Sequence, residues 1–113
     1  MTVNQRTAEQ VADAMFALSA PSRVQILVCL LEGPSTVSDL VGVLGMEQSA
    51  VSHQLRVLRE YALVRAERMG RQRVYTLHDE HVEALLRAAL GHVDQRRRRG
   101  ILGRQILRRR ATG

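Results

Sequence analysis

The sequence predicts a mainly α-helical fold with one small β-hairpin, and three observations support this fold class. Apolar residues recur every three or four positions in five separate segments, which is the period of an amphipathic helix. Between residues 63 and 77 this period gives way to short, partly alternating stretches around a central glycine, as expected of a hairpin. The length of 113 residues fits one domain.

The first two helices are predicted at residues 7–18 and at about 21–32, where the apolar positions follow helical spacing. Pro21 suits the first turn of the second helix, because its ring fixes a helical φ and the first turn needs no N–H donor. Gly33 and Pro34 end that helix.

The next two predicted helices are short and close together. Thr36 can cap a helix that ends near Gly45, and Asp39 stands at the position that returns a hydrogen bond to the cap. Gly45 allows a tight reversal, and a helix follows from about residue 47 to 61. Its inner apolar stripe consists of Val51, Leu55 and Leu58. Two short helices joined through a glycine-containing turn predict a helix-turn-helix.

A hairpin with strands at 63–68 and 73–77 and a turn at 69–71 comes directly after this pair. A hairpin in that place is called a wing, so the complete prediction is a winged helix-turn-helix. The helical period returns from Asp79 to about Gln95. Residues 1–95 are therefore predicted to form the folded domain.

Residues 96–113 form an Arg-rich tail that we expect to be flexible. All 17 basic residues are Arg, and eight of them follow residue 95, where no acid occurs. Residues 1–95 hold the other nine Arg against all 11 acids, a net charge of −2. The tail is interpreted either as a solvated, disordered segment or as a source of non-specific, salt-sensitive DNA affinity.

The outer face of the predicted helix at 47–61 carries side chains that can reach base edges and phosphates. The major groove admits one such helix, and its N-terminal part usually contacts the bases. The predicted DNA-reading residues are Gln48, Ser49, Ser52, His53 and Arg56. On the hairpin, Arg can enter the minor groove, and the predicted residues are Arg68, Arg71 and Arg73. The competing interpretation is a solvated polar helix face and a charged turn.

Three segments resemble the ArsR/SmtB family of metalloregulatory repressors. Residues 46–59 (MEQSAVSHQLRVLR) resemble its recognition helix, residues 18–27 (LSAPSRVQIL) the opening of its second helix, and residues 70–75 (GRQRVY) its wing. The resemblance implies a homodimer formed through the first and last helices, and binding to a palindromic operator, usually to repress. It also implies an inducer that weakens the binding.

The family's metal site on the last helix has the pattern Asp-x-His, ten residues, His-x-x-(Glu or His). Asp79, His81 and His92 match it, whereas Gln95 stands where the family has a stronger ligand. His81 and His92 are three turns apart, about 16 Å along a helix, so a shared ion requires two antiparallel copies. Oxygen and nitrogen donors favour Ni or Co, with Zn possible.

Other interpretations of this site stay open. Asp79 could cap the helix while the two histidines belong to the dimer interface, and a site that has lost its function would leave regulation to a partner protein or another signal. Activation instead of repression is a further alternative. The family's second, cysteine-containing site has no counterpart, since Thr36 and Ser38 occupy its positions.

Enzymatic activity is not expected, because the sequence offers no nucleophile–base spacing, phosphate-binding loop or pair of catalytic carboxylates. Cys29 is the single cysteine, which excludes an intramolecular disulfide and suggests a small buried hydrophobe. The longest apolar run is too short to cross a bilayer. No signal-peptide pattern opens the chain, so we expect a cytoplasmic protein without a membrane partner.

Overall fold

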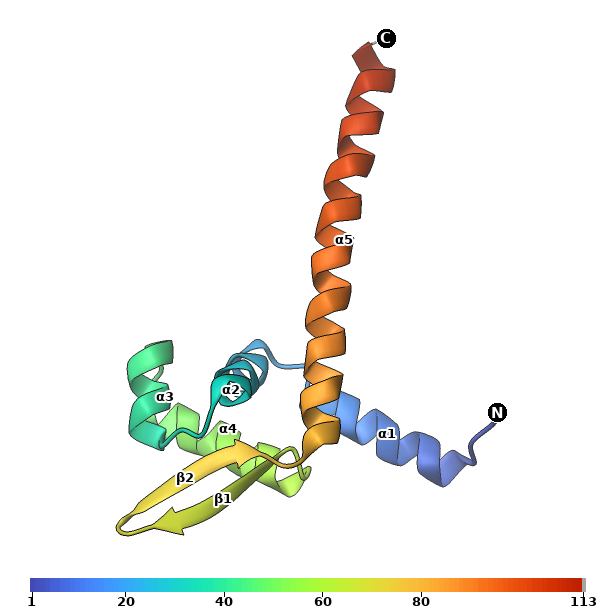
Figure 1. Cartoon of the computed structure of the whole chain (residues 1–113). Coiled ribbons are helices and arrows are strands. Elements are labelled where there is room, and N and C mark those ends of the chain that lie inside the picture. The colour runs from blue at the N-terminus through green and yellow to red at the C-terminus, as the bar shows by residue number, and fades with distance from the viewer. Residues whose placement is uncertain (113) are drawn as a thin grey trace. The chain divides into compact units, whose positions relative to one another are not determined.

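The computed structural model describes the backbone of residues 1–112 and the side chains of residues 1–100. The elements follow the order α1–α2–α3–α4–β1–β2–α5 (Figure 1). The predicted fold class, mainly helical with one hairpin after a helix-turn-helix, is confirmed. The chain divides into two compact units, residues Met1–Glu83 and the segment from Ala84 onwards.

Helices α2 (Pro21–Glu32), α3 (Val37–Leu44) and α4 (Gln48–Glu60) pack against one another. A capping box starts α3: the Asp39 N–H donates to Thr36 Oγ1 at 3.1 Å, and the Thr36 N–H donates to Asp39 Oδ2 at 2.9 Å. Gly45 ends α3 with a φ of 66°, a left-handed conformation that favours glycine. These local signals set the tight turn between α3 and α4.

The core of the first unit comes mainly from the three packed helices. All of its largest fully buried side chains lie on α2, α3 and α4, and they are Ile26, Leu27, Leu40, Val51, Leu55 and Leu58. The predicted inner stripe of α4 is therefore confirmed. Because one side of α4 is fixed against this core, its opposite side is held at the surface.

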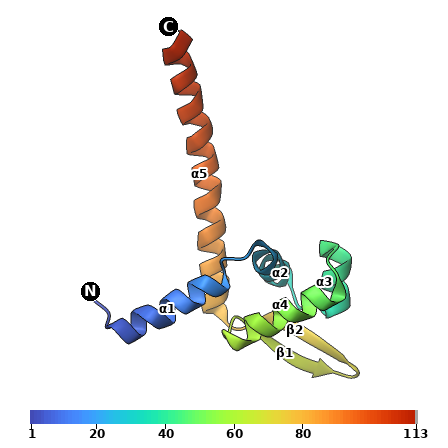
Figure 2. The ribbon, with the colours of Figure 1, turned by 180° about the vertical axis from the view of Figure 1, so that it is seen from behind.

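The strands β1 (Val64–Met69) and β2 (Gln72–Leu77) pair in antiparallel register, with Met69 opposite Gln72 at the turn. Gly70 opens the two-residue loop with a φ of 64°, as type II′ hairpin turns require. The hairpin also contacts α4 (Figure 2).

An isolated bridge connects the loop before α3 to the hairpin. The Tyr75 N–H donates to the Ser35 carbonyl at 2.8 Å, and the Ser35 N–H donates to the Tyr75 carbonyl at 3.1 Å. Tyr75 is also buried. The middle of β2 is thus joined by both hydrogen bonds and packing to the helix-turn-helix.

Helix α1 (Gln5–Ala17) is capped by Asn4, whose side chain accepts a hydrogen bond from the Thr7 N–H at 2.8 Å. Ala17 is its single buried residue. Three large apolar side chains of α1 are at least half exposed, and they are Val11, Met15 and Phe16. Helix α1 therefore presents an apolar surface to solvent.

Helix α5 runs from Glu80 to Thr112, 17 residues beyond the end indicated by the apolar pattern. Leu90 and Val93 on this helix are 43% and 47% exposed. The assignment of residues 96–113 as a flexible tail stays a prediction. Among the described residues, no single helix has the length and apolar character to cross a membrane, and only α1 and α2 taken together, bent by 86°, satisfy both criteria.

Candidate nucleic-acid interface

The outer face of α4 carries all five residues predicted to read DNA. Four of these side chains are exposed and Ser52 is half-buried, while Val51, Leu55 and Leu58 on the opposite face are buried. The polar set is thus available for contact with a ligand, as the helical period indicated.

A hollow of about 540 Å³ lies between α4 and the hairpin. Three guanidinium groups and one carboxylate line it, so its local charge is positive. The lining residues are Ser52, Arg56, Arg59, Glu60, Arg73 and Tyr75. Three residues predicted separately from the sequence, Ser52, Arg56 and Arg73, are therefore brought together in one site.

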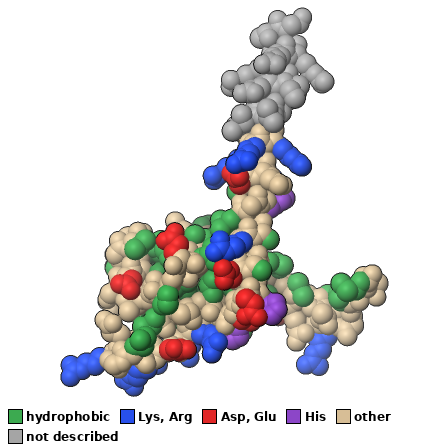
Figure 3. Space-filling model, viewed as in Figure 1, with side chains coloured by type: hydrophobic (Ala, Val, Ile, Leu, Met, Phe, Trp, Pro, Cys, Tyr) green, Lys and Arg blue, Asp and Glu red, His purple; other side chains and the backbone are tan. Residues whose placement is uncertain are grey.

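A second hollow of about 470 Å³ continues toward the hairpin turn and is more basic than the first. Four of its six lining residues are Arg, against one Glu, and the set is Arg59, Ala66, Glu67, Arg68, Arg71 and Arg73. Figure 3 shows Arg side chains gathered at the free end of the hairpin. All three predicted wing residues thus line one basic surface.

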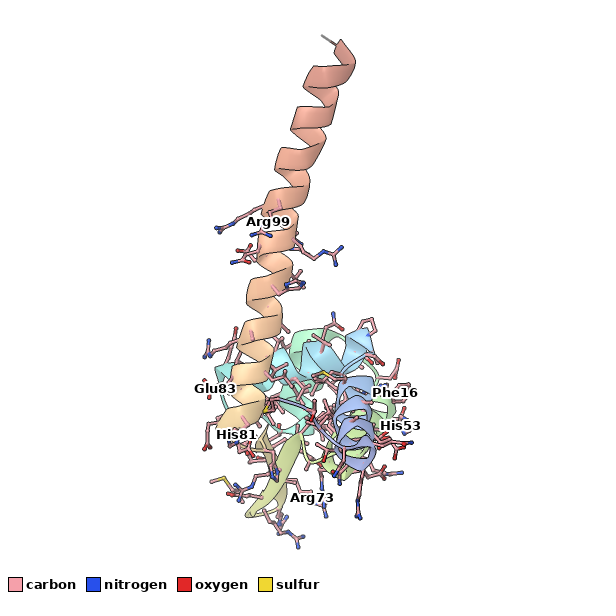
Figure 4. All side chains as sticks on the ribbon, turned by 90° about the vertical axis from the view of Figure 1, so that its right-hand side faces the viewer. Phe16, His53, Arg73, His81, Glu83 and Arg99 are labelled. Atoms are coloured by element: carbon pink, nitrogen blue, oxygen red, sulfur yellow. The ribbon has the colours of Figure 1, made fainter. Side chains whose placement is uncertain are left out.

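Arg59 and Arg73 line both hollows and connect them into one surface, here called the basic groove. Arg59 was missed as a site residue, although it belongs to the Arg-rich stretch between Arg56 and Arg73. Its spacing of three residues from Arg56 could have indicated the shared face. Gln48, Ser49 and His53 line neither hollow and lie on the N-terminal half of α4. Figure 4 shows His53 on α4 and Arg73 on the hairpin.

Arg23 on α2 connects α4 to the end of α1. Its guanidinium donates to the Gln54 side-chain oxygen at 3.2 Å, to the Phe16 carbonyl at 3.4 Å and to the Ala17 carbonyl. A single half-buried side chain therefore ties the C-terminal carbonyls of α1 to α4. Such fixed geometry is what a preorganised binding surface needs.

Asp79 serves as the N-cap of α5. Its Oδ1 accepts hydrogen bonds from the Val82 N–H at 3.1 Å and the His81 N–H at 3.0 Å. The hydrogen bond from Val82 is the largest cause that lowers the pKa of Asp79, so this carboxylate is ionised at neutral pH. The imidazole Nδ1 of His81 lies 3.7 Å from the same oxygen, and its side chain is 86% exposed.

Asp79 and His81 together offer a carboxylate oxygen and an imidazole nitrogen, which suit Ni, Co or Zn. His92 and Gln95 are exposed on α5. Within the described part of a single chain, no three His, Cys, Asp or Glu side chains gather into a metal-binding group. The donor types fit a transition metal, but a complete site needs ligands beyond the Asp79–His81 pair.

Cys29 is free and half-buried, and burial, with a contribution from Glu32, raises the pKa of its thiol. It belongs to no group of three or more metal-binding side chains among the described residues.

The helix-turn-helix, the hairpin beside it and the basic groove define a DNA-binding protein of the winged helix-turn-helix class. Residues 20–66 match the family described as bacterial regulatory protein, arsR family. The HTH-type transcriptional regulator NmtR of Mycobacterium tuberculosis is 52% identical over 90 residues, which cover 80% of this chain and 75% of NmtR. This chain therefore belongs to the ArsR family of transcriptional regulators, and the resemblance seen in the sequence is confirmed. Because the family is one of regulators, the expectation that the chain is not an enzyme is also confirmed.

Solved structures agree with this assignment. The solution structure of apo-NmtR matches with a TM-score of 0.72 and 49% identity, covering 84% of this chain and 80% of that one. The homodimeric winged helix-turn-helix DNA-binding domain of Mb0332 from Mycobacterium bovis matches with a TM-score of 0.77 and 30% identity, covering 83% and 90%. A second relative found by sequence, a transcriptional repressor SmtB homolog of Synechocystis, is 40% identical over 88 residues, covering 78% of this chain and 67% of that protein.

Proposed function

We propose that this regulator is a homodimeric repressor that binds a palindromic operator and releases it in response to a transition metal. The observation that carries the DNA-binding part is the basic groove between α4 and the hairpin. A groove in which Arg side chains from a helix and a hairpin converge is suited to phosphates on both sides of a major groove.

The roles of the site residues follow from their positions. We assign base contacts to the outer face of α4, and phosphate or minor-groove contacts to the hairpin. The α4 set is Gln48, Ser49, Ser52, His53 and Arg56, and the hairpin set is Arg68, Arg71 and Arg73. Arg56 can contact either a base edge or a phosphate, since it lies on the outer face of α4 and also lines the basic groove.

Two exposed apolar surfaces support the homodimer. Val11, Met15 and Phe16 on α1 are exposed, as are Leu90 and Val93 on α5. Contiguous exposed apolar patches usually mark interfaces, and helical spacing places Val11 beside Met15 and Leu90 beside Val93. The related Mb0332 domain, described as homodimeric, supports the same assembly.

For the metal, we assign Asp79 and His81 of one protomer together with His92 and Gln95 of the other. The ion would be Ni or Co, with Zn possible, because the donors are nitrogen and oxygen. When bound, it would cross-link the two copies of α5. DNA affinity would change only by the difference in metal affinity between the DNA-fitting dimer and other dimer geometries.

A second candidate is a family member with a degenerate metal site. The cap bonds of Asp79 favour it, because a helix cap alone accounts for this residue. In that case DNA affinity would be set by a partner protein or another signal, and activation would be as compatible with the fold as repression.

The test is DNA binding by the purified protein with and without Ni, Co and Zn, using a duplex that the protein selects from a random-sequence pool. We expect metal to weaken binding in wild type and to have no effect in His81→Ala, whose apo affinity should equal that of wild type. Asp79→Asn separates the two roles of Asp79, because Asn caps a helix as well as Asp but is a weaker metal ligand. It should keep the thermal stability and lose the metal response.

Release of DNA by metal in His81→Ala would contradict the assigned site. If no ion affects wild type, the degenerate-site alternative holds, and the DNA-binding assignment is unaffected. If no duplex is enriched over random sequence, the operator-binding proposal itself fails.

A further inference from the structure

The turn of α5 at residues 96–99 is the most concentrated positive charge among the described side chains. Arg96, Arg97, Arg98 and Arg99 are consecutive and all exposed. At about 100° per residue, four consecutive positions point to all sides of a helix. This segment, here called the Arg collar, is therefore a ring of guanidinium groups.

Among the described residues, few acidic groups neutralise the collar. Arg98 pairs with Asp94 at 3.2 Å, and both side chains are largely exposed, at 77% and 60%. For Arg96, Arg97 and Arg99 the described part of the chain shows no acidic partner. Like charges at such spacing repel one another and disfavour the free helix. A polyanionic ligand would relieve this repulsion.

The positive charge of the whole chain is concentrated after residue 95. Residues 1–95, which contain the entire winged helix-turn-helix, carry nine Arg and 11 acids, a net charge of −2. Long-range attraction to DNA depends on the positive charge of the protein. That charge is supplied after residue 95, where eight Arg occur and no acid. Four of these Arg form the collar, and the side chains of the other four lie outside the described residues.

We propose that the Arg collar binds the phosphate backbone of duplex DNA as a second, sequence-independent contact. The proposal rests on the DNA-binding function inferred above. A helix turn charged on all sides has no apolar face to bury in a protein groove. It also lacks the apolar face that an interfacial membrane helix requires. Duplex DNA needs neither, because its phosphates line its surface and bind guanidinium groups without any apolar contact.

The experiment compares two full-length variants with wild type. In one, all four collar Arg are replaced by Gln (R96Q, R97Q, R98Q and R99Q), and in the other by Lys. Gln has nearly the same helix propensity as Arg but no charge, and Lys keeps the charge that a phosphate contact needs. Fluorescence anisotropy measures affinity for the selected operator duplex and for a random-sequence duplex of equal length over a series of KCl concentrations.

We expect the Gln variant to lower the slope of log affinity against log salt by ~0.9 for each phosphate that the collar no longer neutralises, hence by at least ~1.8 in a dimer. The decrease should be the same on both duplexes, and the Lys variant should behave as wild type. An unchanged slope in the Gln variant on the operator duplex would overturn the proposal.

Two further outcomes are decisive. If the Gln variant keeps its salt slope but loses binding to vesicles of phosphatidylglycerol and phosphatidylcholine, the collar serves a membrane surface and the proposal is wrong. The ratio of operator to random-duplex affinity in wild type tests the proposed function separately, since that ratio does not depend on the collar.

Discussion

Arg56 combines two features at the scale of a single residue: it lies on the exposed face of α4 and it lines the basic groove. We predict that Arg56→Ala weakens operator binding by about 1–3 kcal/mol, or roughly 5- to 150-fold. Fluorescence anisotropy with the selected duplex checks this. Arg65→Ala is the matched control, because Arg65 is also exposed but lines neither hollow. An equal loss in both variants would indicate a general charge effect.

Arg59 is predicted to contact phosphate, since it lies where the two hollows meet. Arg59→Ala should weaken binding to operator and random duplexes to a similar extent. It should also lower the salt slope by ~1 per protomer. Affinity measured against KCl concentration on both duplexes checks the prediction. A change in base preference without a change in slope would instead assign Arg59 to base reading.

The difference between these two residues shows what could be predicted from sequence at this scale. Helical periodicity depends only on local spacing, so it identified the exposed face with Ser52 and Arg56. The same spacing could have placed Arg59 on a shared face with Arg56, but it could not show that Arg59 lines both hollows, because the hollows depend on where Arg73 of the hairpin lies. The position of the hairpin results from tertiary packing, about which helical periodicity gives no information.

At the scale of elements, the capping box of α3 determines where the helix-turn-helix begins. Thr36→Ala removes the hydroxyl that accepts from the Asp39 N–H. We predict a loss of about 1 kcal/mol in the free energy of unfolding. Urea denaturation checks this value. Ser38→Ala, at an exposed position of the same helix, should change stability by less than about 0.5 kcal/mol. Equal effects of the two substitutions would show that the cap contributes little.

Element boundaries were predicted well where a glycine marks the end of a helix or a turn, and poorly where no such residue occurs. Gly33, Gly45 and Gly70 mark real ends or turns. The end of α5 was placed 17 residues too early, at Gln95, because the apolar stripe stops there. The period of apolar residues indicates which face of a helix is buried, and a helix can continue beyond the last buried position, as α5 does.

At the scale of the whole molecule, we propose that the exposed apolar side chains of α1 form part of the dimer contact. Phe16 on α1 is 67% exposed in the single chain (Figure 4). We predict that Phe16→Ser weakens the dimer and operator binding together, as sedimentation velocity and anisotropy would measure. Val43→Ser is the control, because Val43 is 73% exposed on α3, away from the proposed interface. If both variants sediment as wild type does, α1 is not part of the dimer contact.

The sequence alone could not establish this assembly. An exposed apolar side chain and a core side chain obey the same helical period, so the pattern of α1 predicted a helix but not the partner of its apolar face. The same holds for the metal ligands, since His81 and His92 require a second chain to share one ion. Family resemblance, and not periodicity, supplied the homodimer and the ligand pattern.

The bridge between Ser35 and Tyr75 has a consequence for target choice. Two backbone hydrogen bonds fasten β2 to the loop that leads into α3, so hairpin and reading helix share one rigid frame. In the proposed complex, the offset between the bases that α4 contacts and the backbone that the hairpin contacts is then constant. We expect each half-site to provide both at that offset, so that the groove width and stiffness of base pairs without side-chain contacts contribute to the recognised sequence.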